Sequence, residues 1–310
     1  MNDYVIIADI ASDLNAAMRK KFGVADVLPG HITFPDGHEE TADLEWGNIS
    51  SEAFYASMRD RKNVYKTSLP SLGEIMDTFE KYLVQGLDVL SISLSGGMSG
   101  TYSATIVAAK KLAEKYPDRR VVCFDSLRYS TALSAMCVFA ARMRAQGKSL
   151  EEVHAWLLKN KYCFHQMGSL DDLFFLQRQG RVSGTAAVMG TLVGIKSMAD
   201  FNREGRCTVL AKPLGFKAVY KGTIGYMKRT IVDPEHQTVF VAHSNREKEA
   251  RRLAALIEET FHPEEVVVTT VGQSCGVNIG PGLMAAFYHG TEISEDLANE
   301  TAMLAEALAE

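Results

Sequence analysis

The amino-acid sequence predicts an α/β fold of two domains, an N-terminal three-layer domain built on a parallel sheet and a C-terminal α/β domain with a mixed sheet. The length of 310 residues fits two domains of ordinary size. Continuously apolar runs alternate with amphipathic helical segments in the first half, whereas strand-like pieces surround a helix in the second. We therefore expect domains at residues 1–158 and 159–310.

Three buried strands are expected in the first half, at residues 4–9, 87–95 and 120–125. Their hydrophobicity is continuous rather than alternating, which is typical of a parallel sheet covered by helices on both faces. Asp13 follows the first strand and is expected to cap the next helix.

Helices are expected between these strands. Ser71 and Glu74 form a capping box, in which each side chain accepts a hydrogen bond from a backbone N–H group at the helix start. The next helix spans residues 101–116, and its expected apolar face consists of Tyr102, Ile106, Ala109 and Ala113. Further helices are expected over residues 129–146 and from Ser149 and Ser169.

The second half of the chain has a different order of expected strands and helices. Strand-like pieces at residues 207–210, 238–242 and 266–271 surround a helix over residues 247–261. Residues 294–308 have the pattern of a terminal amphipathic helix.

Composition excludes several classes of protein. The chain has 33 Lys and Arg against 38 Asp and Glu, so it lacks the basic excess of a nucleic-acid-binding protein. Its cysteines and histidines are scattered without the spacing of metal ligands, so no metal is expected. The first residues lack the pattern of a signal peptide, and no apolar run reaches the length of a membrane span. We expect a cytoplasmic protein without stable membrane insertion.

A glycine-rich loop at residues 93–102 joins an expected strand to an expected helix. Its glycines allow close backbone approach to a ligand, and a helix start with hydroxyl donors suits an anion. The plain alternative is a tight turn. Ser99 also stands in a near match to a nucleophile elbow, with Thr101 in place of the final glycine, so a serine hydrolase with His243 is a further alternative.

Three other segments carry candidate polar groups. Thr67 and Ser68 precede the capped helix and could simply be its entry. Arg181 follows an expected helix end and is either a surface residue or a partner for a carboxylate or phosphate. Residues 276–282 form a glycine-rich turn that could present backbone N–H groups to a site.

Taken in order, these segments resemble the motifs of the DegV family of bacterial fatty-acid-binding proteins. Asp9 and Asp13 are placed as in its D-S-x-x-D motif, and residues 67–71 are similar to T-S-Q-P-S. Residues 94–102 are similar to S-S-x-L-S-G-T-Y, and residues 125–130 to D-S-x-x-x-S. Residues 171–183 are similar to D-D-L-x-x-L-x-x-G-G-R-I-S. The resemblance extends from Ala8 to about Phe287.

The resemblance implies a fatty acid held in a tunnel between two α/β domains, with its carboxylate near the glycine-rich loop. It implies a carrier without chemistry of its own, the binding subunit of a fatty acid kinase, which presents the carboxylate to a separate kinase subunit that makes acyl phosphate for phospholipid synthesis. No cofactor is implied. The ligand-binding residues expected from it are Thr67, Ser68, Ser95, Ser99, Gly100, Thr101, Ser126, Arg181, Asn278 and Gly280.

The sequence departs from the family pattern late in the chain. Asn278 and Ile279 stand where the family has the histidine and threonine of H-T-G-P-G. Asparagine can donate a hydrogen bond but cannot carry a positive charge. This departure keeps open an alternative, a carrier of a different or uncharged lipid.

Overall fold

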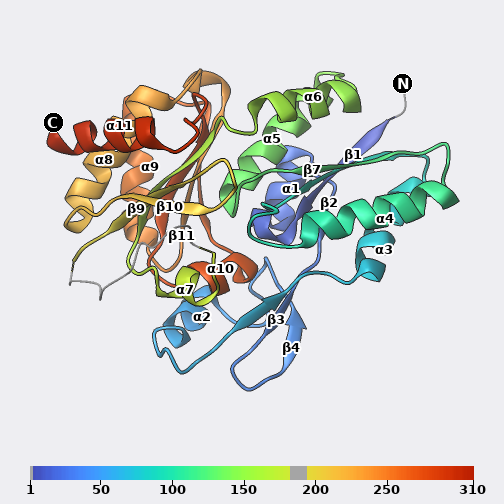
Figure 1. The fold of residues 1–310 in the computed structure, drawn as a ribbon, viewed down its shortest axis with the longest axis horizontal. Coiled ribbons are helices and arrows are strands. Elements are labelled where there is room, and N and C mark those ends of the chain that lie inside the picture. Colours follow the sequence, from blue (N-terminus) through green and yellow to red (C-terminus); the bar gives the residue numbers. More distant parts are fainter. Residues whose placement is uncertain (1–2, 182–193) are drawn as a thin grey trace.

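A computed structural model describes residues 3–181 and 194–310 (Figure 1). Its first sheet has four parallel strands in the order β2-β1-β6-β7, which are β1 (Tyr4–Asp9), β2 (Asp26–Leu28), β6 (Asp88–Ser93) and β7 (Val121–Asp125). Every residue of β1 and β6 is buried, because helices cover both faces of the sheet. The three strands expected in the first half are thus confirmed as β1, β6 and β7.

Two layers of helices enclose this sheet. One layer contains α3 (Leu72–Leu83) and α4 (Thr101–Lys115), and the other contains α1 (Ala16–Phe22), α5 (Thr131–Ala145) and α6 (Leu150–Asn160). Successive residues of β1 pack against opposite helix layers, since side chains alternate between the two faces of a strand. Val5 and Ile7 pack with α3 and α4, whereas Ile6 and Ala8 pack with α5.

The second sheet is mixed. Its strand order is β10-β9-β8-β13-β11-β12, and only β11 and β12 pair in parallel. Its strands are β8 (Phe164–Leu170), β9 (Ser197–Phe201), β10 (Cys207–Ala211), β11 (Thr238–His243), β12 (Glu265–Thr270) and β13 (Met284–His289). Its outer face packs against three helices, α8 (Gly215–Thr230), α9 (Glu247–Phe261) and α11 (Ala298–Ala309).

Helix α5 lies between the two sheets. It contacts β1 and β6 of the first sheet and β8, β11 and β13 of the second. Ten of its 15 residues are buried. One hydrophobic cluster therefore runs without a break from Ile6 in the first sheet, through Leu133 in α5, to Phe287 in the second. Figure 1 shows α3 and α4 at one end of the molecule and α8 and α11 at the other, with α5 between.

A small antiparallel sheet, β4-β3-β5, lies below the two large sheets in Figure 1. It consists of β3 (His31–Thr33), β4 (Glu39–Thr41) and β5 (Lys66–Ser68), and it packs with α2 (Ser51–Ser57), α7 (Phe174–Arg178) and α10 (Gln273–Ile279). Ile32, Phe175 and Val277 belong to one buried cluster here. Segments from the start, middle and end of the chain thus meet at this place. Two 3-10 helices, η1 (Ile10–Ser12) and η2 (Pro234–His236), complete the described elements.

Most of the expected helices are confirmed. The capping box of Ser71 and Glu74 opens α3, and an equivalent box of Ser149 and Glu152 opens α6. Helix α9 covers residues 247–261 as expected, while α4, α5 and α11 differ from the expected helices by a few residues at one or both ends. The strand-like pieces of the second half are confirmed as β10, β11 and β12.

Two predictions near helix starts are wrong. Ser169 does not begin a helix, because it lies in the buried strand β8, and α7 begins only at Phe174. Asp13 does not cap α1, whose first turn is capped by the Asn15 side chain. Asp13 is instead buried with a left-handed backbone (φ 61°) at the end of η1.

The apolar face expected for α4 is also displaced. The buried residues are Thr101, Thr105, Ala108 and Leu112, one position before those expected. Three of these four side chains are small, so this part of the helix can lie close to the sheet. The domain division expected at residues 158 and 159 falls near the end of α6 and stays a prediction, since a single core joins both halves. In the described part of the chain, no helix is long and apolar enough to cross a membrane.

Candidate functional site

The glycine-rich loop leads from β6 into the N-terminus of α4. Gly100 is the residue before the helix and has no side chain to cap the first turn. The Ser99 hydroxyl lies 2.9 Å from the Thr101 hydroxyl and accepts a hydrogen bond from the Thr101 N–H group (3.3 Å). A helix of 15 residues that begins this way offers free N–H groups and a partial positive charge beside two hydroxyls. This arrangement suits an anionic group.

A polar pocket of about 290 Å³ opens at this helix start. Most of its lining comes from the end of β1 with η1, from β5 and the segment after it, from the glycine-rich loop and from α10, and Gly30, Tyr129 and Arg181 complete it. Seven residues expected at the site are among its lining residues, and they are Thr67, Ser68, Ser99, Gly100, Thr101, Arg181 and Asn278. The fold therefore brings together segments that lie more than two hundred residues apart.

Ser95 lies beneath the loop, outside the described lining of the polar pocket. Its buried hydroxyl donates to the Gly205 carbonyl (2.8 Å) and accepts from the Gly97 N–H group (3.1 Å). Gly205 belongs to the turn between β9 and β10 and has a φ of +71°. A Cβ atom there would lie 1.9 Å from the Ser95 hydroxyl oxygen. The hairpin of the second sheet thus holds the glycine-rich loop of the first.

Ser126 and Gly280 are the other two expected residues outside the pocket lining. The Ser126 hydroxyl is buried and exchanges hydrogen bonds with the backbone of Arg128. Gly280 ends α10 with a φ of +75°, and a Cβ atom there would lie 2.0 Å from the Phe175 ring. Both residues have structural partners in the described chain.

Asp9 is a lining residue that the sequence analysis did not place at the site. Its carboxylate accepts from the N–H groups of Ala11 (2.9 Å) and Leu94 (3.5 Å). Burial raises the pKa of Asp9 to about 6, and these two hydrogen bonds oppose the increase. Its position at the end of a parallel strand, beside the strand that carries the glycine-rich loop, is a signal that could have identified it.

Arg181 and Asn278 approach the pocket from the second half of the chain. The Arg181 Nε donates to the Met98 carbonyl (3.3 Å), and its guanidinium also contacts the Gln179 carbonyl. The Asn278 amide nitrogen donates to the Tyr129 hydroxyl and to the Ser274 carbonyl, at 3.1 Å each. Both amide protons of Asn278 are thereby used within the protein, whereas no donor in the described part of the chain bonds to its carbonyl oxygen.

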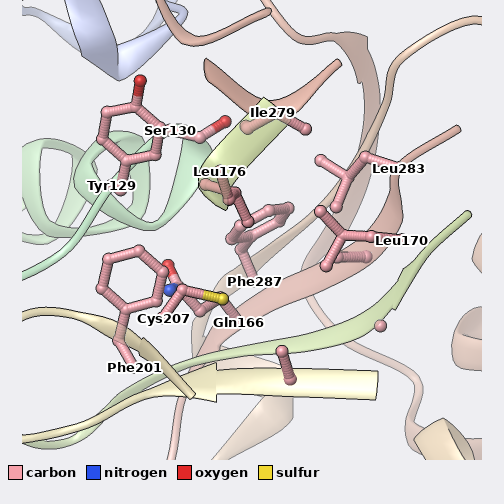
Figure 2. Close-up of a pocket in the computed structure, with 13 residues that line it drawn as sticks. Tyr129, Ser130, Gln166, Leu170, Leu176, Phe201, Cys207, Ile279, Leu283 and Phe287 are labelled. Carbon is pink, nitrogen blue, oxygen red and sulfur yellow. The ribbon is translucent and has the colours of Figure 1, made fainter. Parts of the chain in front are cut away.

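An apolar pocket of about 50 Å³ adjoins the polar one, and Tyr129 lines both (Figure 2). Its floor is the inner face of the second sheet, and its other walls include Leu176, Ile279 and Leu283. This volume has room for about four water molecules. An acyl chain can therefore enter only if the lining side chains move apart.

The described residues offer little for other chemistry. No group of three His, Cys, Asp or Glu side chains in residues 3–181 and 194–310 is arranged to hold a metal ion. His243, the suggested hydrolase partner of Ser99, is absent from the described lining of both pockets, and burial lowers its pKa.

Comparison with known proteins gives the family. The model of a family described as "uncharacterised protein, DegV family" matches residues 3–290. The chain belongs to the DegV family. A DegV domain-containing protein of Clostridium perfringens is 31% identical over 290 residues, covering 94% of this chain and 98% of the relative. The DegV motif residues 182 and 183 lie outside the described part of the structure.

Solved DegV structures share the fold. A fatty-acid-binding DegV family protein from Thermus thermophilus matches with a TM-score of 0.82 and 24% identity, over 94% of this chain and 100% of that one. A DegV family protein from Eubacterium eligens loaded with heptadecanoic acid matches with a TM-score of 0.81 and 20% identity, over 93% of this chain and 100% of that one. The α/β architecture with a parallel N-terminal sheet and a mixed C-terminal sheet is thus the DegV fold.

Proposed function

We propose that the protein binds a long-chain fatty acid, with the carboxylate in the polar pocket and the acyl chain in the apolar pocket. One observation carries this proposal: a pocket of hydroxyls at an open helix start and an apolar pocket meet at a single residue, Tyr129. A fatty acid likewise combines a polar head group with an apolar chain. The solved DegV relatives with bound fatty acids support the same reading.

The physical chemistry of the two pockets favours this ligand. Ser99, Thr101 and the free N–H groups of α4 can donate to a carboxylate, and charge-assisted hydrogen bonds are among the strongest in proteins. Arg181 adds a positive charge at the same pocket. Burial of the chain contributes about 0.8 kcal/mol per methylene group, which compensates for moving Leu176 and Leu283 aside.

We further propose that the protein performs no chemistry alone and presents the carboxylate to a separate fatty acid kinase subunit in the cytoplasm. The polar pocket is lined by residues from exposed segments, including Leu69 at 46% exposure, so a carboxylate held there lies near the surface. Purified protein loaded with palmitate should support acyl phosphate formation by the organism's kinase subunit and ATP. Acyl phosphate formed without the kinase subunit would contradict this role.

The binding proposal is tested first by organic extraction of the purified protein and mass spectrometry, which should yield a fatty acid in stoichiometric amount. Ser99→Ala should then weaken palmitate binding about 10- to 100-fold, since a hydrogen bond to a charged group contributes about 1.5–3 kcal/mol. Ser103→Ala is the matched control, because Ser103 is exposed on the same helix. Equal affinity of both variants for palmitate would remove Ser99 from the site.

A second candidate ligand is a lipid with an uncharged head group. It is favoured by Asn278, a lining residue whose amide protons are both used within the protein, so that its carbonyl oxygen is the side-chain atom left for a ligand. Such an oxygen suits a hydroxyl better than a carboxylate. Competition between palmitate and hexadecanol decides between the two, because preferential retention of hexadecanol would replace the fatty acid as ligand.

The serine hydrolase alternative has less support. Ser99 bonds to Thr101, and no histidine is among the described residues that line its pocket. Turnover of a long-chain ester that stops on treatment with a serine-reactive phosphonate would restore this alternative and contradict the carrier proposal.

A further inference from the structure

Gln166 is a polar side chain on the apolar floor of the second pocket. It lies in β8 on the same face as Gly168 and Leu170, since side chains alternate along a strand. It pairs with Phe287 of β13, and the register of β8 and β9 places it across from Phe201. The lining residues that these strands contribute to the floor are otherwise apolar, glycine or cysteine.

The amide oxygen of Gln166 has no partner in the described chain. It is buried, and no donor in residues 3–181 or 194–310 bonds to it. The whole residue is only 7% exposed. The backbone N–H of Gln166 donates to the Asp200 carboxylate (3.2 Å), so the missing hydrogen bond concerns its side chain. A buried acceptor without a donor costs free energy, and native proteins seldom leave one unsatisfied.

The direction of this side chain matters. Gln166 is among the residues that line the apolar pocket but not among those that line the polar one. Figure 2 shows its amide end within this pocket, on the side of Phe201 and Cys207. A molecule that enters the apolar pocket is therefore placed to supply a donor to this amide oxygen. Such a donor lies beyond Tyr129, at a distance from the head group.

We propose that the acyl chain carried by this protein bears a hydroxyl group remote from its carboxylate, and that Gln166 recognises this hydroxyl. The proposal rests on the proposed fatty-acid-binding function and specifies its substrate class. The hydroxyl donates to the Gln166 amide oxygen, and its own oxygen can accept from the amide N–H group. A plain acyl chain leaves the amide oxygen unsatisfied, whereas a hydroxylated chain completes it. The rest of the pocket packs against methylene groups.

The test measures the affinities of delipidated wild-type protein and Gln166→Met for stearate, 12-hydroxystearate, 12-ketostearate and 2-hydroxystearate. Methionine keeps the length of the side chain and removes the amide. Wild-type protein should prefer 12-hydroxystearate over stearate about 5- to 10-fold, and Gln166→Met should abolish this preference. 12-Ketostearate has no donor at this position, so its affinity should exceed that of stearate by much less. The hydroxyl of 2-hydroxystearate lies beside the carboxylate, so this acid should bind no more tightly than stearate.

Met167→Leu is the matched control, since Met167 is a buried residue of the same strand that packs on the opposite face of the sheet, outside the described lining of both pockets, and the variant should keep the preference. An equal ratio of 12-hydroxystearate to stearate affinity in wild type and Gln166→Met would overturn the proposal, whereas stearate binding itself would leave the fatty acid function in place. Wild-type protein that binds none of these acids would overturn both. An equal preference of wild-type protein for 12-ketostearate over stearate would also overturn the proposal, because a ketone cannot donate to the Gln166 amide oxygen.

Discussion

Replacing the buried Asp13 by asparagine should make the protein more stable at neutral pH. The Asp13 carboxylate is 3% exposed and accepts hydrogen bonds from the Ser130 hydroxyl and the Gly272 N–H group (2.9 Å). Burial nevertheless raises its pKa from 3.8 to about 7, because these bonds do not replace the lost hydration. Asparagine has the same shape, can accept from Gly272 and can donate to Ser130.

The size of the effect follows from the pKa values. The folded-state pKa of Asp13 lies above the unfolded one, so the folded state favours the protonated form. Its contribution to stability is complete below about pH 3.8 and is lost as pH rises to about 7. A tenfold difference in proton affinity corresponds to about 1.4 kcal/mol, so the loss reaches about 4 kcal/mol at pH 8. The asparagine of the variant does not titrate, and the variant therefore avoids this loss.

The assay is urea unfolding of wild type and Asp13→Asn between about pH 4 and pH 8. The two free energies of unfolding should be similar at pH 4, and the variant should gain several kcal/mol by pH 8. Asp118→Asn is the control, since Asp118 is exposed in the turn before β7. A constant difference between wild type and Asp13→Asn across this range would refute the reasoning, as would a less stable variant at pH 8.

Two further changes probe the loop contact and a helix cap. Gly205→Ala should lower the thermal unfolding temperature much more than Gly23→Ala. Both glycines have a positive φ, but only at Gly205 would a Cβ atom collide with Ser95. Similar decreases for the two variants would mean that the hairpin moves to accommodate the Cβ atom at little cost. Ser149→Ala should cost about 1 kcal/mol in urea unfolding and leave palmitate affinity unchanged, since its capping box lies on α6, away from both pockets. A change in affinity would show that α6 is coupled to the site.

The sequence was informative where structure is decided locally. The capping boxes of α3 and α6 depend on residues three positions apart, and both are present. The strand β8 was missed because it contains His165, Gln166 and Ser169, which are buried only after other strands and helices enclose them. The strands of the small sheet have three residues each, too few for a recognisable period.

The candidate site shows the same limit. The glycine-rich loop and the Thr67–Ser68 pair were identified from their own sequence, and they line the polar pocket. Tyr129 and Gln166 gain their significance only from the fold, because nothing in their neighbouring residues indicates that one joins two pockets or that the other lacks a donor. The hydrogen bond from Asn278 to Tyr129 likewise depends on the fold, because these residues lie far apart in the sequence.

The placement of α5 has a consequence for the synthesis of the protein. A ribosome adds roughly 5–20 residues per second, so about 7–30 s pass between completion of α5 at Ala145 and of β13 at His289. During this interval the apolar face of α5 lacks part of its final cover, because β8, β11 and β13 are completed one after another. The nascent first half therefore exposes an apolar surface, and we expect chaperones that bind such surfaces to associate with it until the second sheet has emerged.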